Sequence, residues 1–224
     1  MDIVDQNIIS FMRDLLPCFD GKLGEVQREA LEKGLPIIEP ETARFLASIC
    51  CALRPKAVLE IGCCTGFSAG VMHRYLGPCG HITTIDRYAV LIKQAKENFK
   101  RLGIEEDITF LEGNAEDILP KLEGKYDFIF LDAAKGQYLT YLPDCIRLLK
   151  IGGVFIADDI FQQGRVVADK LDIPKRQRTI HNRMNRFLQV ATHTPGLTAS
   201  LIPIGDGMLM LTKAQEVLLN AEDN

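Results

Sequence analysis

Short apolar runs alternate with amphipathic stretches from residue 57 onward, and this alternation constrains the fold more than any other feature of the chain. The apolar runs are AVLEI (57–61), HITTID (81–86), ITFLE (108–112), YDFIFLD (126–132) and GVFIAD (153–158). Helical patterns lie between them, over 89–103 and 138–153. Because the runs are nearly continuous in apolar residues, they are typical of strands covered on both faces. The pattern predicts an α/β fold with a parallel sheet and helices on both sides.

The two ends of the chain follow different patterns. Helices are expected over 8–16, 23–32 and 40–53, and the first should bury one apolar face: Ile8, Phe11, Met12, Leu15 and Leu16. At the other end, LTASLIPI (197–204), Gly205-Asp206-Gly207 and MLMLT (208–212) predict a hairpin with an antiparallel edge. We expect one domain over 1–224, with a helical cover (1–54) and a sheet core (55–213).

Composition excludes several classes of protein. The chain has 26 basic and 30 acidic residues and a net charge of −4, so the overall balance does not indicate a nucleic-acid binder. No run approaches 18 apolar residues, and the acidic start is unlike a secretory signal. Seven Cys without a CxxC argue against a zinc knuckle or disulfide framework. We therefore expect a cytoplasmic protein with no membrane partner.

The loop after the first strand, Glu60-Ile61-Gly62-Cys63-Cys64-Thr65-Gly66-Phe67-Ser68, leads into a helix. Gly62 and Gly66 would let the backbone approach a ligand closely, and the helix N-terminus favours an anionic group. Asp86 ends the second strand, where an acid can accept hydrogen bonds from ribose hydroxyls. These features predict a nucleoside-containing cofactor, although not NAD, because GxGxxG is absent. The alternative is a tight turn and a surface Asp.

Three acidic residues follow two neighbouring predicted strands: Asp132, Asp158 and Asp159. The carboxyl ends of adjacent parallel strands meet at the same edge, so these carboxylates should converge and repel unless a cation is bound. All-oxygen ligation favours Mg²⁺, with Mn²⁺ or Ca²⁺ as alternatives. The other interpretation is three separate, solvated acids.

The segment VLEIGCCTGFS resembles the first motif of class I S-adenosylmethionine-dependent methyltransferases. Within them, the chain is similar to the metal-dependent O-methyltransferases of the catechol and caffeoyl-CoA type, from about Pro36 to Lys213. The resemblance implies a Rossmann-like, seven-stranded sheet of order 3-2-1-4-5-7-6 with strand 7 antiparallel. It also implies a homodimer formed with the N-terminal helices.

The resemblance assigns roles by position. It implies that S-adenosylmethionine is bound by Ile38, Glu60, Gly62, Gly66, Ser68, Asp86, Ala115 and Asp132. It places the metal at Asp132, Asp158 and Asp159, although relatives have Asn at position 159. Lys135, three residues after Asp132, matches the family's catalytic Lys. Near a dication its pKa should fall, so that it could take a proton from an acceptor hydroxyl.

The methyl acceptor is suggested by a basic segment. Residues 161–190 contain seven basic and two acidic residues, which could contact phosphates or form a solvated face. DAAKGQY, GGVFIADDI, FQQGRVV and LIPIGDGMLM are most similar to the bacterial branch that methylates 5-hydroxyuridine at the tRNA wobble position, giving 5-methoxyuridine. This implies a tRNA anticodon loop as partner, with Tyr138, Tyr141 and Phe161 as stacking candidates.

Two other functions stay open on the sequence. The first is methylation of small vicinal phenols, catechol-like or of the caffeoyl type, which needs no basic segment. The second is a non-catalytic S-adenosylmethionine- or nucleotide-binding module, which Asp159 and the vicinal Cys pairs keep open.

Overall fold

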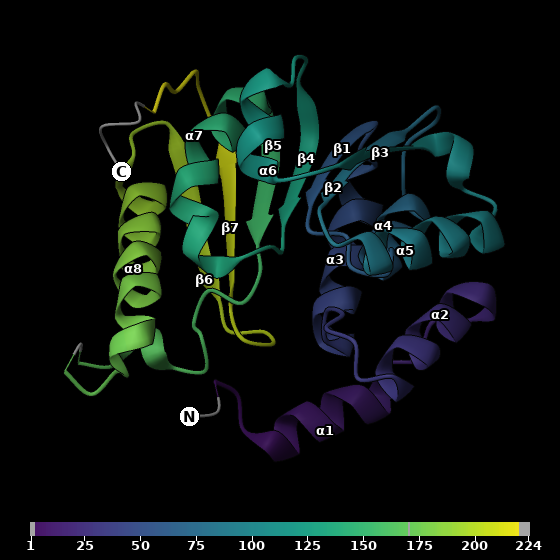
Figure 1. The fold of residues 1–224 in the computed structure, drawn as a ribbon, viewed down its shortest axis with the longest axis horizontal. Helices are drawn as coiled ribbons and strands as arrows, with labels where there is room; N and C mark the ends of the chain where they lie inside the picture. The colour runs from purple at the N-terminus through teal and green to yellow at the C-terminus, as the bar shows by residue number, and fades with distance from the viewer. Residues whose placement is uncertain (1–2, 170, 220–224) are drawn as a thin grey trace. The chain divides into compact units, whose positions relative to one another are not determined.

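The computed structural model describes residues 3–169 and 171–219, and in this part of the chain the strands form a seven-stranded sheet of order β3-β2-β1-β4-β5-β7-β6 (Figure 1). The strands are β1 (Ala57–Ile61), β2 (His81–Asp86), β3 (Ile108–Glu112), β4 (Tyr126–Leu131), β5 (Leu149–Ala157), β6 (Leu197–Ile202) and β7 (Met208–Lys213). β2 runs parallel to β1 and β3, and β5 parallel to β4, whereas β7 is antiparallel to β5 and β6. The predicted α/β class, strand order and antiparallel strand 7 are confirmed.

The chain divides into two compact units. The first spans residues 5–115 and contains the strands β1 to β3 with the helices α1 (Gln6–Leu15), α2 (Gly21–Glu32), α3 (Pro40–Leu53), α4 (Phe67–His73) and α5 (Ala89–Leu102). The second, from residue 116 on, contains β4 to β7 with α7 (Tyr138–Leu148) and α8 (Arg178–His193), and the short α6 (Ala115–Ile118) falls at the boundary. The single domain, with its division at residue 54, stays a prediction. Of the described residues, no helix is long and apolar enough to cross a membrane.

Successive residues of β4 explain why the apolar runs were nearly continuous. Phe128, Ile129 and Phe130 are all fully buried. Since neighbouring side chains of a strand point to opposite faces, both faces of β4 are covered. In the same unit, α7 packs against both β4 and α8 (Figure 1).

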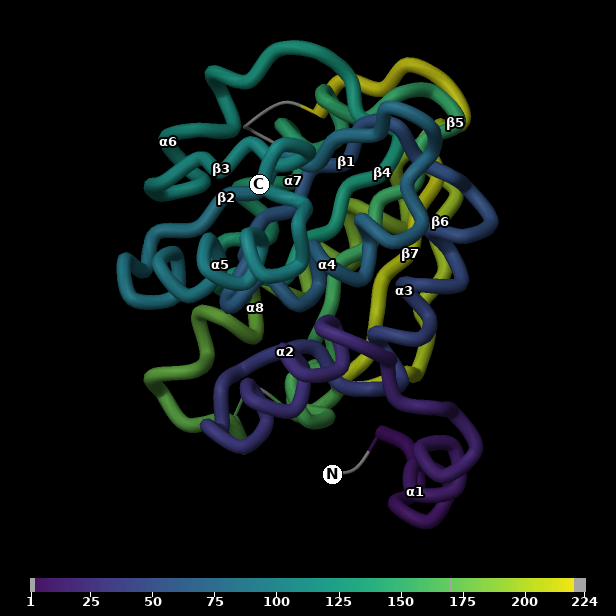
Figure 2. The backbone as a smooth tube through the Cα atoms, turned by 90° about the vertical axis from the view of Figure 1, so that its right-hand side faces the viewer, coloured from purple at the N-terminus to yellow at the C-terminus, as the bar shows by residue number. Residues whose placement is uncertain are grey.

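The helix α1 forms where the apolar pattern predicts it, but its apolar face is not buried. Over its described length none of its residues is buried, and Phe11 and Leu15 are 61% and 66% exposed. Figure 2 shows α1 at the margin of its unit, away from β1 to β3. Arg13 ties it instead to the start of α3, with ion pairs of 2.6 Å to Glu39 and 2.9 Å to Glu41. The predicted buried face is wrong for this chain, and the homodimer stays a prediction.

The boundary between α7 and β5 also differs from the prediction. The helical pattern extends to residue 153, whereas α7 ends at Leu148 and β5 begins at Leu149. Leu149 is fully buried and pairs with Tyr126 of β4. Pairing with the neighbouring strand therefore overrides the local helical periodicity.

Lys213, at the end of β7, is a fully buried cation. Its ammonium donates hydrogen bonds to the carbonyls of Ile146 (3.1 Å) and Leu149 (3.2 Å), and pairs with Glu216 at 2.8 Å. Lys213→Met should leave these partners without their donor. We expect it to lower the free energy of unfolding by about 3 kcal/mol, or the melting temperature by about 6–12 °C. Thermal unfolding measures this, with Lys121→Met as the surface control. Equal melting temperatures of Lys213→Met and the parent would contradict it.

Candidate active site

The loop between β1 and α4 is fastened by Asp86, at the end of β2. One carboxylate oxygen of Asp86 accepts hydrogen bonds from the backbone N–H groups of Cys63 and Cys64, each at 3.0 Å. The other accepts from the N–H groups of Arg87 (2.6 Å) and Tyr88 (3.0 Å). Asp86 thus fixes the shape of the predicted cofactor loop, and its contact with a ribose stays a prediction.

A second carboxylate, that of the fully buried Glu60 on β1, also fixes this loop. It accepts hydrogen bonds from the hydroxyls of Ser68 (2.5 Å) and Thr84 (2.6 Å). These two contacts join β1, β2 and the first turn of α4. Ile38 and Ala115, two further predicted cofactor residues of this unit, are buried as well, whereas Gly62 is half-buried.

The loop also contains a polar atom that sequence reasoning did not single out. Thr65 is buried, and its hydroxyl oxygen has no hydrogen-bond partner among the described residues. A buried unpaired hydroxyl beside Gly66 fits a loop that receives a ligand. Cys63, by contrast, is a packing residue: burial, followed by the charge of Glu60, raises the pKa of its thiol well above the ordinary value. A raised pKa is the opposite of the low-pKa thiolate that a helix N-terminus can stabilise.

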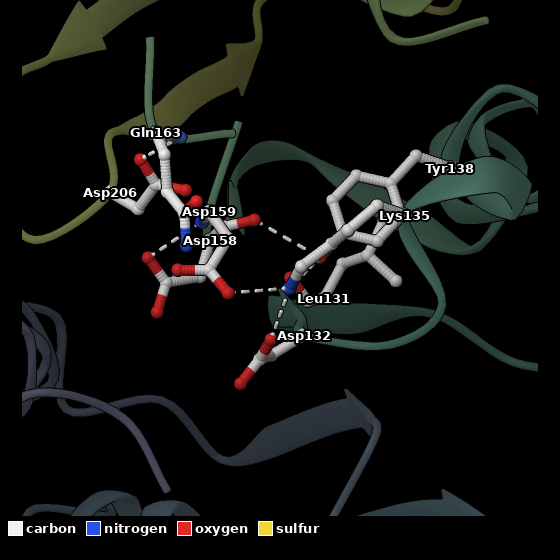
Figure 3. A network of polar contacts seen from close by, with 8 residues as sticks. All are labelled: Leu131, Asp132, Lys135, Tyr138, Asp158, Asp159, Gln163 and Asp206. Atoms are coloured by element: carbon white, nitrogen blue, oxygen red, sulfur yellow. Dashed lines mark hydrogen bonds and ion pairs between the residues drawn. The ribbon is translucent and has the colours of Figure 1, made fainter. Parts of the chain in front are cut away.

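The other unit gathers the predicted metal and catalytic residues around one ammonium group (Figure 3). The Nζ atom of Lys135 lies 2.7 Å from an oxygen of Asp132 and 2.9 Å from an oxygen of Asp159. It also donates to the hydroxyl oxygen of Tyr138 at 3.1 Å, and this hydroxyl donates to the backbone carbonyl of Asp158 at 3.0 Å. The spacing of three residues therefore does bring Lys135 to Asp132.

The charges in this cluster do not balance, because three acids face one Lys. Burial, and then the charges of Asp132 and Asp159, raise the pKa of Asp158 well above its usual range. Burial also raises the pKa of Asp132, although the Lys135 charge opposes this. Burial disfavours the ammonium form of Lys135, but the surrounding Tyr138, Asp132 and Asp159 outweigh it and raise the pKa of Lys135 well above normal. Lys135 is therefore protonated in this state.

The cluster fits a divalent cation in its chemistry, although it is not assembled as a metal site. Buried carboxylates with excess negative charge are the donors that Mg²⁺ prefers. Within residues 3–169 and 171–219, however, no group of three or more His, Cys, Asp or Glu side chains is arranged to hold a metal ion. The ammonium of Lys135 lies instead between Asp132 and Asp159. Asp132, Asp158 and Asp159 remain the predicted ligands.

The raised pKa of Asp158 has a consequence for stability. A carboxyl group with a raised pKa in the folded state contributes stability below its unfolded pKa of about 4, and loses it as pH rises through the folded value. Asp158→Asn removes this loss and should raise the melting temperature of the chelator-treated protein at pH 7.5 by about 2–4 °C, or about 1 kcal/mol. Thermal unfolding between pH 4.5 and 8 measures it. The same pH profile in both proteins would argue against a raised pKa.

A pocket of about 680 Å³ opens beside this cluster, entirely within the second unit. Lys135 and Asp159 line it, together with side chains from the loop after β5, from α8 and from the β6–β7 turn: Gln162, Gln163, Arg165, Ile180, His181, Arg183 and Asp206. The lining therefore includes Lys135, the residue predicted to be catalytic.

Three of these lining residues were missed by sequence reasoning. Asp206 was assigned only to a turn, yet it accepts a hydrogen bond from the Gln163 N–H at 2.6 Å, and burial raises its pKa. Gln162 and Arg183 carried no distinguishing signal. Ile180, on α8, is 37% exposed and lines the pocket as well.

Two aromatic expectations are wrong. Tyr138 is fully buried and Tyr141 is buried as well, so neither ring is available to stack on a base. The Tyr138 ring instead packs against Phe187 with ring centroids 5.5 Å apart. Phe161 is half-buried, and its ring lies so close to Gly207 that a side chain there would meet it at 2.1 Å.

The basic segment separates into different environments. Lys175, Arg176 and Arg186 are exposed. Arg178 donates to backbone carbonyls of its own loop, including that of Ile173 at 2.9 Å, and Arg183 lines the pocket. The segment is therefore not one solvated face.

The sheet order, the reversed β7 and the fastened loop after β1 define the architecture of class I methyltransferases. Within that class, the chain belongs to the O-methyltransferase family of S-adenosylmethionine-dependent enzymes, whose family model, described as "O-methyltransferase", matches residues 21–214.

The chain is similar in sequence to relatives with two named activities. It is 31% identical to a catechol O-methyltransferase of Mycobacterium tuberculosis over 74% of this chain and 73% of the relative. It is also 31% identical to a caffeoyl-CoA O-methyltransferase of Medicago sativa, over 75% of this chain and 71% of the relative. A solved structure of a putative O-methyltransferase from Klebsiella pneumoniae superposes with a TM-score of 0.80 at 27% identity, covering 96% of this chain and 97% of that one.

Proposed function

We propose that the chain transfers the methyl group of S-adenosylmethionine to one of two neighbouring oxygens of an acceptor, with a divalent cation at Asp132, Asp158 and Asp159. The observation that carries this proposal is the Lys135 ammonium within 3 Å of two carboxylates at the wall of a pocket. A proton-transfer group, candidate ligands and space for an acceptor are thereby joined in one unit.

The chain's own residues supply positioning and proton transfer. A bound Mg²⁺ would polarise the two acceptor oxygens and lower the pKa of the hydroxyl. When the negative charges of Asp132 and Asp159 are compensated, the raised pKa of Lys135 would fall and its ammonium would release a proton to solvent. The neutral amine would then take the hydroxyl proton at Nζ. The hydroxyl of Tyr138 holds Lys135 at 3.1 Å, so the amine stays beside the pocket.

Methyl transfer also requires the cofactor and the acceptor to meet. The residues assigned to S-adenosylmethionine belong mainly to the first unit, whereas Lys135 and its carboxylates belong to the second. In an in-line transfer, the acceptor oxygen attacks the sulfonium methyl from the side opposite to the sulfur.

As the acceptor we propose 5-hydroxyuridine in the anticodon loop of tRNA. Its O4 and O5 oxygens are neighbours, as the two oxygens of a catechol are. The exposed Lys175, Arg176 and Arg186 belong to the segment that borders the pocket and could contact phosphates. The second candidate is a small vicinal phenol, which is favoured by the names of the catechol and caffeoyl-CoA relatives.

Methyl-transfer assays separate these candidates. The purified protein with labelled S-adenosylmethionine and Mg²⁺ is offered tRNA that carries 5-hydroxyuridine, and separately catechol and caffeoyl-CoA. Lys135→Met should lower the transfer rate by about 10²–10⁴, whereas the exposed-site control Lys175→Met should retain transfer to small phenols. Unchanged 5-methoxyuridine in tRNA from a strain that lacks the gene removes the tRNA acceptor. Cofactor binding without transfer to any acceptor favours a non-catalytic module.

A further inference from the structure

Two residues that line the pocket beside Lys135 each contain a buried nitrogen atom that lacks the partner buried donors normally have. These atoms are Nε2 of Gln162 and Nε of Arg183, both shielded from solvent and without a hydrogen-bond partner in the described part of the chain. Only four buried side-chain atoms of the described residues are unpaired in this way, and these two both belong to residues that line this one pocket. Buried donors are almost always paired, so two orphans at one pocket indicate a missing acceptor.

Arg183 is fixed in place but not neutralised. Its guanidinium donates to the hydroxyl of Thr140 on α7, which holds the side chain across from α8. No carboxylate of the described residues pairs with it. The two acids that line the same pocket have other partners, since Asp159 pairs with Lys135 and Asp206 accepts from the Gln163 N–H. The positive charge of Arg183 is therefore left without an anion.

Gln162 is held by a strained loop. Asp159, Gln162 and Gln163 have left-handed φ values of 55°, 52° and 57°, which residues other than Gly adopt at a cost. Hydrogen bonds to the β6–β7 turn keep the loop in this shape, from Ile160 N–H to the Gly207 carbonyl (3.0 Å) and from Gln163 N–H to Asp206. The fold thus maintains an unfavourable backbone at Gln162, which lines the pocket and whose buried amide nitrogen is unpaired.

The two unpaired groups are both donors, and one is charged. A guanidinium favours carboxylate and phosphate oxygens over neutral ones, because these hydrogen bonds are charge-assisted. The amide N–H of Gln162 can donate to the same kind of ligand. We propose that Arg183 and Gln162 bind an anionic oxygen group, a carboxylate or a phosphate, which the methyl acceptor carries in addition to its vicinal oxygens. This rests on the proposed function, because it takes the pocket beside Lys135 as the acceptor pocket.

Two matched pairs of ligands test the inference by calorimetry, with S-adenosylhomocysteine and Mg²⁺ present so that no methyl is transferred. One pair is catechol and 3,4-dihydroxybenzoate, and the other is 5-hydroxyuridine and its 5′-monophosphate. The anionic member of at least one pair should bind about tenfold more tightly or better, and the pair that shows the preference tells carboxylate from phosphate. Arg183→Gln should reduce the preference to about twofold or less.

Control variants separate recognition from folding. Arg28→Gln removes an exposed Arg on α2 that does not line the pocket, so the preference should persist. Arg183→Lys keeps the charge but lacks the Nε donor, and Gln162→Leu keeps the bulk of the side chain but lacks the amide. Both Arg183→Lys and Gln162→Leu should weaken the preference for the anion without changing the melting temperature.

The possible outcomes separate a failure of the proposed anion site from a failure of the proposed methyl transfer. Equal affinity within both pairs, undetectable binding of both anions, or a preference that survives in Arg183→Gln overturns the inference. A preference that is present without any methyl transfer, when S-adenosylmethionine replaces the product, overturns the proposed function alone. Transfer without an anion preference overturns the inference alone.

Discussion

Asp132→Ala should lower the rate of methyl transfer at least about 10³-fold, and a chelator should do the same to the unaltered protein. The carboxylate of Asp132 is both a predicted metal ligand and a partner of Lys135 at 2.7 Å. If the cation provides about 4 kcal/mol of transition-state stabilisation, its loss corresponds to about this factor. Transfer rates with saturating S-adenosylmethionine, before and after chelation and with Mg²⁺ restored, measure the effect.

A matched control is available in the loop that follows β5. Asp172 is exposed, and Asp172→Ala removes the same functional group away from the cluster, so the rate should stay within about twofold. If chelated, metal-free protein transfers methyl at the full rate, the cation has no role. In that case the Asp132–Lys135 pair would act alone, and Asp132→Ala would lower activity without any dependence on Mg²⁺.

The fold was predictable because its signals are local. The runs at 57–61, 81–86 and 108–112 became strands with those limits, since each is short, apolar and followed by a helix-forming stretch. Predictions failed where the outcome depends on contacts with residues far away in the sequence. The exposed apolar face of α1 and the early start of β5 at Leu149 follow from what the chain packs against, which periodicity does not encode.

The candidate site divides in the same way. Lys135 was singled out because its spacing from Asp132 matches that of the family's catalytic Lys, and the structure brings the two side chains together. Arg183 is one of seven basic residues in its segment, and nothing in the sequence distinguishes it from Arg186. Only the packing of α8 against α7 places its guanidinium beside Thr140 at the pocket. Residues joined by tertiary contacts between loops, such as Gln163 and Asp206, cannot be paired from their spacing in the sequence.

Gly66→Ala should cost both stability and cofactor affinity, because this position has neither the space nor the backbone angle for a side chain. Gly66 has a φ of 80°, and an added Cβ would lie 2.5 Å from a ring carbon of Phe99. Phe99 is buried, so its ring cannot simply move away. We expect a loss of about 2–4 kcal/mol in the free energy of unfolding, or about 4–16 °C in melting temperature. The affinity for S-adenosylmethionine should fall about tenfold or more, since the clash displaces the loop.

Gly103 provides the matched control, because it shares the backbone angle but not the crowding. Its φ is 71°, and an added Cβ would meet nothing within 4 Å. Gly103→Ala should therefore cost only the conformational penalty of about 1 kcal/mol and leave cofactor affinity unchanged. The difference between the two variants isolates the close approach at Gly66 from its backbone angle. If both variants bind S-adenosylmethionine as the parent does, the loop after β1 does not hold the cofactor. If both lose affinity equally, global stability rather than the loop governs binding.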